Sequence, residues 1–281
     1  NEMCHRNIMM MDLFAALAWD PAKVELDGFL RRYAERRYGP RAAGPHFEAT
    51  RAVGRTLLSH YNMDATNGPL YRRWMPTYLP GLTPASVRRS LGWLPHLRRA
   101  CEGLLEGAGA TPDCALLRFD LVDLGRTYLG TLFNYHFARA RLAFRAGDRQ
   151  DLARHRERCL ATMRSVAALC SAHPQFRLAT WDQWARRWPP LVPGRDNAAT
   201  NWLIFTALIS GQSWRALLDY VAEDLAELVL FYYLPRVERY FAQWDADFSL
   251  MAEELSPGMK AIGGVGNGIF EMAQDFAGYE G

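Results

Sequence analysis

The sequence predicts an all-α protein, and three features carry the prediction. Apolar residues recur at the helical period almost throughout the chain. Runs of alternating polarity, which half-buried strands would need, are nearly absent. The breaks between periodic segments hold helix-ending pairs such as Asp20-Pro21 and Gly39-Pro40. We therefore expect a multi-helix, bundle-like domain with no sheet beyond a residual strand at the very start.

The first third of the chain divides into short helices. Met9, Leu13 and Ala16 line one face of a helix that ends near Trp19, and a second helix runs from Leu26 to Gly39-Pro40. A third is expected over 46–61. Residues 62–82 are rich in proline, glycine and aromatic residues, which indicates an ordered loop. Thr83-Pro84, a capping residue before a proline, then opens helices to about Leu105.

The longest apolar stripe runs from Ala115 to Ala146 and is followed by Gly147-Asp148. A second long stripe covers 149–171. Two such helices joined by a tight turn predict an antiparallel hairpin.

The last third is expected to hold helices at 179–187 and 197–208, and a long one over 213–243. Pro235 should kink that long helix, because proline removes one backbone hydrogen bond. Residues 255–281 form a glycine-rich tail with a short helix near 269–276.

Composition narrows the classes of function. The 281 residues are 49% hydrophobic and 22% charged, which is typical of a globular protein. The net charge is only +3 and the arginines are spread along the chain rather than gathered in one stripe, so no nucleic-acid partner is expected. Lys23 and Lys260 are the only lysines, a bias that suits a GC-rich bacterial genome. No apolar run reaches the ~18–20 residues that cross a bilayer, so no membrane span is expected.

The reactive residue types form no known signature. Five scattered cysteines without a CxxC pair do not make a disulfide framework. No HExxH motif occurs, and GGVGNG at 263–268 lacks a preceding strand, so neither a metal nor another cofactor is expected. The chain begins with Asn1 and shows no signal peptide, so we expect it to be the back part of a longer protein.

Two side-chain patterns leave alternatives open. Asp120, Asp123 and Arg126 stand at i, i+3 and i+6 of one helix, a spacing that favours structural ion pairs over a functional site. Trp181, Trp184 and Trp188 share a helix face. Such a stripe is usually core, although exposed aromatic rings also stack on sugars.

Four segments, in order, resemble the carboxy-terminal helical domain of glycoside hydrolase family 89, the α-N-acetylglucosaminidases. They are FLRRYAERRYG (29–39), RFDLVDLGR (118–126), FRLATWDQWAR (176–186) and LDYVAEDLAELVLFYYLPRVERYF (218–241). In that family a (β/α)8 barrel precedes the helical domain. The resemblance implies that residues 1–20 close the barrel, 21–254 form the helical domain and 255–281 a tail.

The resemblance also implies site residues. Glu2 matches the nucleophilic glutamate at the end of the last barrel strand, although its neighbours Asn1 and Met3 depart from the family's proline and glycine. Asn7 matches an asparagine that follows that glutamate, and Tyr220 matches a pocket tyrosine. The family's pocket tryptophan has no counterpart near Phe205, and Trp214 is our candidate replacement.

These matches imply a retaining glycosidase acting on a terminal α-linked N-acetylglucosamine or a related sugar. Such enzymes need two carboxyl groups, and the acid/base partner of Glu2 would belong to the upstream barrel, so this chain alone is expected to be inactive. Glu2 and Tyr220 are expected to face one pocket. The alternative is a non-catalytic helical interaction module derived from the same fold. The sequence leaves the oligomeric state and the compartment open.

Overall fold

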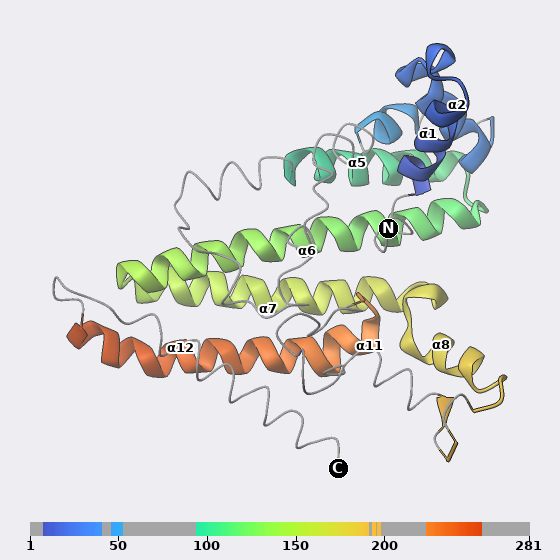
Figure 1. Ribbon diagram of the computed structural model, residues 1–281. Helices are drawn as coiled ribbons and strands as arrows, with labels where there is room; N and C mark the ends of the chain where they lie inside the picture. The colour runs from blue at the N-terminus through green and yellow to red at the C-terminus, as the bar shows by residue number, and fades with distance from the viewer. Residues whose placement is uncertain are drawn as a thin grey trace. The chain divides into compact units, whose positions relative to one another are not determined.

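The computed structural model describes residues 8–40, 46–52, 94–190, 193–194, 196–197 and 223–254. Every regular element in these ranges is a helix, so the all-α prediction is confirmed for the part of the chain described. The chain divides into two compact units, residues 1–68 with 89–131 and residues 69–88 with 132–281. Helix α6 (Ala115–Ala146) contributes its first part to one unit and its last part to the other (Figure 1).

The first unit contains α1 (Ile8–Trp19), α2 (Leu26–Tyr38), α5 (Leu94–Gly107) and the first part of α6. Short 3₁₀ turns follow α1 and α5, at η2 (Pro21–Lys23) and η7 (Ala108–Ala110), and residues 47–52 are helical. The two ends of α2 lie where the sequence predicted them. The Glu25 carboxylate accepts the Asp27 and Gly28 N–H groups at its start, and Gly39 ends it with φ +94°.

Two apolar clusters hold the first unit together. Met9 and Leu13 of α1 pack with Phe29, Leu30 and Tyr33 of α2 and with Phe47. The second cluster joins α2, α5, residue 49 and the start of α6, through Ala34, Tyr38, Ala49, Leu97, Ala100, Leu104, Leu117 and Leu124.

Gly107 at the end of α5 permits a close approach of the buried His46 side chain. A Cβ atom on Gly107 would lie 2.2 Å from the His46 ring. Since real Cβ atoms do not approach other atoms so closely, this site requires glycine.

The second unit contains the last part of α6, α7 (Arg149–Ser171), η8 (Pro174–Phe176) and α8 (Leu178–Ala185). Its remaining helices, α11 (Ala226–Leu228), η9 (Val229–Tyr233) and α12 (Leu234–Glu254), follow one another without a break (Figure 1).

The turn between α6 and α7 confirms the predicted hairpin ends. Gly147 adopts φ +74°, and the Gly147 and Asp148 N–H groups donate to the carbonyls of Phe144 and Ala143. This is the Schellman arrangement, which ends a helix at glycine. The Asp148 carboxylate then accepts the Asp151 N–H at 2.9 Å and caps α7.

Aromatic side chains fill the core of the second unit, between α6 and α12. Trp244 is 2% exposed, and its ring centroid lies 4.8 Å from that of Tyr240 and 4.9 Å from that of Phe144. Phe137 and Phe241 complete the group, with centroids 5.7 and 5.5 Å from Trp244. We call these five residues the aromatic core. Beside them α7 and α12 run together, tied by Arg156 to Asp245 and by Arg164 to Glu238 (Figure 1).

The predicted helix over 213–243 is wrong in part. Residues 223–225 are not helical, and Leu225 is extended with φ −98° and ψ +142°. The π-helical turn η9 lies just before Pro235, at the place where the sequence predicted a kink. A wider turn relieves the clash between the proline ring and the carbonyl four residues earlier, so the chain stays helical into α12.

Several expectations fall outside the described residues. These are the start strand, the loop 62–82, the helix over 197–208 beyond Asn197, the glycine-rich motif 263–268 and the tail helix near 269–276.

Candidate functional site

The four predicted site residues, Glu2, Asn7, Trp214 and Tyr220, all lie outside the described residues. The structure does describe the two segments that continue from them. α1 begins at Ile8, directly after Asn7, and the segment 223–254 begins three residues after Tyr220. Each belongs to a different unit, and each is held by its own contacts.

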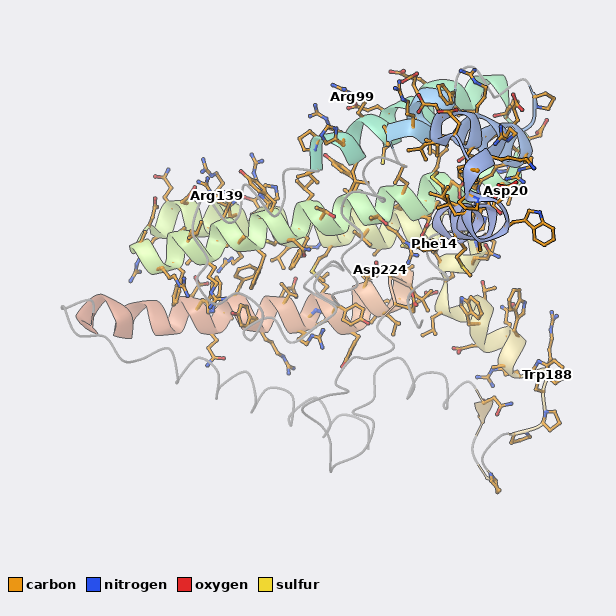
Figure 2. The ribbon with its side chains drawn as sticks, turned by 45° about the horizontal axis from the view of Figure 1, so that its top comes forward. Phe14, Asp20, Arg99, Arg139, Trp188 and Asp224 are labelled. Carbon is orange, nitrogen blue, oxygen red and sulfur yellow. The ribbon has the colours of Figure 1, made fainter. Side chains whose placement is uncertain are left out.

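α1 is apolar on more than one face. Met9 and Leu13 are buried against α2, whereas Met11, Phe14 and Trp19 are 49%, 52% and 92% exposed. Figure 2 shows Phe14 among the side chains of the first unit. A helix that is apolar all round normally has neighbours on every side. The outer face of α1 therefore has the character of a contact surface.

The segment after Tyr220 is attached to α7 and α8. The Cys170 thiol donates to the Asp224 carbonyl at 3.4 Å. The Glu227 carboxylate accepts the Leu178 N–H at 2.7 Å. Leu178 is the first residue of α8, and the residue before it supplies no side-chain cap, so Glu227 caps α8 from a distant part of the chain.

The π-helical turn η9 carries a cluster of tyrosines and arginine. The Arg236 guanidinium lies 5.1 Å from the ring centroids of both Tyr232 and Tyr233. Tyr233 is fully buried, while Phe231 is 67% exposed. π-helical turns occur often at functional sites, and this one falls within 218–241, one of the four segments that resemble family 89.

The charged residues of α6 form structural pairs, as their spacing favoured. Asp120 accepts hydrogen bonds from both Arg37 nitrogens that face it and, at 2.8 Å, from the Tyr38 hydroxyl. Burial and the Asp120 charge raise the pKa of Tyr38, so its hydroxyl remains a donor. Asp123 instead pairs with Arg126 one turn along α6, at 2.6 Å. The sequence could not show that the partner of Asp120 is on α2.

Two buried histidines meet between α6 and α7. Nδ1 of His136 lies 3.0 Å from Nδ1 of His155, and Nε2 of His155 lies 3.6 Å from the Asp151 carboxylate. Burial, the other histidine and Arg158 lower the pKa of His136 to about 4. Burial also lowers the pKa of His155, although Asp151 opposes the change. Both pKa values are lowered, so the neutral form of each ring is favoured near pH 7.

The tryptophan stripe at 181–188 is not core. Trp181, Trp184 and Trp188 are 40%, 44% and 73% exposed, and we call them the tryptophan face. Trp181 and Trp184 lie on α8, whereas Trp188 lies beyond its last residue, Ala185. The sequence held no signal for this exposure, because polar residues also alternate with the apolar stripe of a half-buried helix.

Within the described ranges, no group of three or more histidine, cysteine, aspartate or glutamate side chains is placed to hold a metal ion. None of the helices described there is long and apolar enough to cross a membrane. Cys101, Cys114, Cys159 and Cys170 are free thiols.

Comparison with protein families gives one result that covers most of the chain. The family model described as the alpha-N-acetylglucosaminidase (NAGLU) C-terminal domain matches residues 29–256. A search of curated proteins found no match. The matched residues include most of α2, the hairpin of α6 and α7, α8 with its cap from Glu227, and the segment from α11 to α12. The chain therefore belongs to the family of alpha-N-acetylglucosaminidase C-terminal domains.

Proposed function

We propose that this chain is the carboxy-terminal helical part of a retaining α-N-acetylglucosaminidase of glycoside hydrolase family 89. In this role it completes the sugar pocket beside a catalytic barrel. The observation that carries the proposal is the family match over residues 29–256, which spans helices of both units. The sugar is a terminal α-linked N-acetylglucosamine or a close relative.

The exposed apolar side chains on the outer face of α1 favour the presence of a neighbouring domain that packs on them. Exposing Met11, Phe14 and Trp19 to water costs free energy, at about 25 cal/mol for each Å² of apolar surface. An upstream barrel packed on this face would recover that free energy. Because α1 directly follows Asn7, such packing would also hold Glu2 and Asn7 in place.

The proposed chemistry is a double displacement. The Glu2 carboxylate attacks the anomeric carbon while a second carboxylic acid, supplied by the barrel, protonates the departing oxygen. A covalent glycosyl–enzyme intermediate forms, and water then releases the sugar with the second residue acting as base. Asn7 would bind a sugar hydroxyl. Tyr220 and Trp214 would contact the ring, with the Tyr220 hydroxyl bonding a sugar oxygen.

The decisive experiment uses the full-length protein that carries this chain and an aryl α-N-acetylglucosaminide. Glu2→Gln removes the attacking charge and keeps the side-chain shape, so we expect kcat to fall by at least about a thousandfold. KM should change little. Glu48→Gln is the matched control, because the Glu48 side chain is 72% exposed and contacts only Arg51 among the pairs described, at 3.7 Å.

Three outcomes would contradict the proposal. Near-normal turnover by the Glu2→Gln protein would remove Glu2 from the mechanism. Turnover by the 281-residue chain alone would mean that the chain holds both carboxyl groups and that the barrel is not needed. Substrate binding without any turnover by the full-length protein would favour the non-catalytic interaction module.

A further inference from the structure

Arg141 is a buried cation of the second unit. The residue is 9% exposed and lies on α6 between Phe137 and Phe144, the two α6 members of the aromatic core. Residues three and four apart share a face of a helix, so Arg141 belongs to the same face as these rings. Within the described residues, its buried Nη1 nitrogen has no hydrogen-bond partner. A buried charge is unfavourable unless an opposite charge and hydrogen bonds compensate it.

Two other arginines with comparable burial do have such a partner. The Arg126 side chain is 9% exposed and lies 2.6 Å from the Asp123 carboxylate. The Arg37 side chain is 10% exposed and binds Asp120 through two nitrogens. By contrast, the described groups that act on the charge of Arg141 are Arg145 and Tyr240, and neither is a carboxylate. Arg141 thus departs from the pattern of the other two.

Arg141 keeps its charge in this position. Burial, and then the positive charge of Arg145, lower the pKa of the guanidinium, whereas Tyr240 opposes the change. Arginine nevertheless stays protonated in proteins, because its ordinary pKa lies above about 12. Arg145 is half-buried one turn along α6 and adds a second positive charge on the same side of the helix. The two arginines together favour an anion.

Two further hydrogen-bond donors lie near Arg141. Tyr240 of α12 is 3% exposed, and burial raises the pKa of its hydroxyl, which therefore keeps its proton. Arg141 and the Trp244 indole N–H both oppose this increase of the pKa, so both lie close to the Tyr240 hydroxyl. Within the described residues, however, the buried Nε1 of Trp244 is outside hydrogen-bonding geometry with any acceptor. Donors from α6 and α12 therefore gather in one place that lacks an acceptor for two of them.

This set of donors selects an oxyanion. A water molecule could accept the hydrogen bonds, but it would leave the charge of Arg141 uncompensated. The two arginines would repel a metal cation. The planar guanidinium fits the paired oxygens of a carboxylate or phosphate group, and a charged acceptor also strengthens the bonds from an indole N–H and a phenol O–H. A small carboxylate or phosphate therefore has the chemistry that the place requires.

We propose that Arg141, Tyr240 and Trp244 form a binding site for a small oxyanion between α6 and α12. The bound anion would neutralise Arg141 and join the two helices, so it would stabilise the second unit without taking part in sugar cleavage. The site requires neither Glu2 nor Tyr220 and stands or falls separately from the proposed pocket.

Titration calorimetry and thermal unfolding of the full chain test the proposal, with inorganic phosphate or acetate exchanged for chloride at constant ionic strength. We expect at least one of these anions to bind at a single site with a Kd of about 1 mM or tighter. At a hundredfold excess of the anion over its Kd, Tm should rise by about 5 °C. The rise should follow the logarithm of the anion concentration, whereas a general salt effect increases in proportion to it.

The test variants change the site and preserve the fold. Arg141→Met removes the charge, keeps a long side chain and should abolish the binding. In chloride buffer its Tm should equal or exceed that of the wild type, because an uncompensated buried charge has been removed. Tyr240→Phe removes one hydroxyl and should weaken binding about tenfold. Arg99→Gln is the matched control, since Arg99 is an exposed arginine of α5 in the other unit, and it should leave binding unchanged.

Three results would overturn the proposal: no saturable binding of either anion at about 10 mM, an unchanged Kd in Arg141→Met, or an equal loss of affinity in Arg99→Gln. Asp247→Asn distinguishes a free anion from a carboxylate of the chain itself, because Asp247 follows Trp244 by three residues on α12. This variant should bind the anion as the wild type does. Binding that appears only in Asp247→Asn would assign the counter-charge of Arg141 to the chain and would also overturn the proposal.

Discussion

Tryptophan is buried in the aromatic core of α6 and α12 but exposed in the tryptophan face at 181–188. Trp244 is 2% exposed and surrounded by Phe137, Phe144, Tyr240 and Phe241, whereas Trp188 is 73% exposed. Both belong to the second unit and follow a helical period. The difference lies in the side chains that pack against each ring.

Near Trp244 the residues one turn earlier on α12 are Tyr240 and Phe241, which add to the same buried face. Near Trp188 the residue one turn earlier is Trp184, which is itself 44% exposed. Charged residues interrupt both stripes, since a glutamate and an arginine directly precede the buried Tyr240 on α12. A tryptophan period therefore does not by itself report core, because polar residues also alternate with the apolar stripe of a half-buried helix.

The largest expected effect is on the buried side of the comparison. Trp244→Ala removes the centre of the aromatic core and leaves a cavity, so we expect the free energy of unfolding to fall by about 3–5 kcal/mol. Urea unfolding followed by circular dichroism measures the change. A loss below about 1 kcal/mol would mean that the core collapses around the cavity and that Trp244 is not its centre.

The second expected effect is a loss of stability in acid, caused by the two buried histidines between α6 and α7. The folded pKa of His136 is about 4, below its ordinary value of 6.5, so the unfolded chain binds more protons between these pH values. Stability should therefore fall as pH drops through this window, by up to about 1.4 kcal/mol per pH unit for each such histidine. His155, whose pKa is also lowered, adds to the effect with the same sign.

Urea unfolding at several pH values between about 7 and 4 tests this dependence. His136→Asn combined with His155→Asn removes the titrating groups and should flatten the slope. His96→Asn, a change at an exposed position of α5, should leave it intact. An unchanged slope in the double variant would assign the acid response to other groups.

Local signals made most of the fold predictable. The end of α6 follows from Gly147, which can adopt a positive φ. The start of α7 follows from Asp148, whose carboxylate caps that helix. The start of α11 was missed because it depends on contacts distant in sequence. These are the Cys170 thiol at the Asp224 carbonyl and the Glu227 carboxylate at the first turn of α8.

The candidate site was less predictable for the same reason. The roles of Glu2, Asn7, Trp214 and Tyr220 come from resemblance alone, and no period or spacing in the chain indicates them. The partner of Asp120 is 83 residues away, at Arg37, and no local pattern names it. Exposure of the tryptophan face likewise depends on which helices pack against α8, a property of the folded chain.

A smaller loss of stability is expected at Glu227, which lies on the segment that leads into α12 and contacts α8. Glu227 follows the buried Ala226 and caps α8, which carries two residues of the tryptophan face. Glu227→Ala should cost about 0.5–2 kcal/mol, because it leaves the Leu178 N–H without its carboxylate. Hydrogen exchange measured by mass spectrometry should show faster exchange over residues 178–185 and unchanged protection in α7.

Glu227→Gln provides the control, since its amide oxygen can still accept the Leu178 N–H. It should restore most of the protection of α8. Faster exchange across α7 and α12 in the alanine variant would show that Glu227 supports the whole second unit, and the two regions could not then be separated through α8.

The smallest effect is expected on the exposed side. Trp188→Ala removes an indole that is 73% exposed and leaves its backbone carbonyl free to keep the Asn197 contact at 3.0 Å. Stability should therefore change by no more than about 0.5 kcal/mol, the usual range for surface substitutions. Urea unfolding of this variant beside Trp244→Ala is the direct comparison. A loss above about 2 kcal/mol would reveal that Trp188 is packed in solution and belongs on the buried side of the comparison.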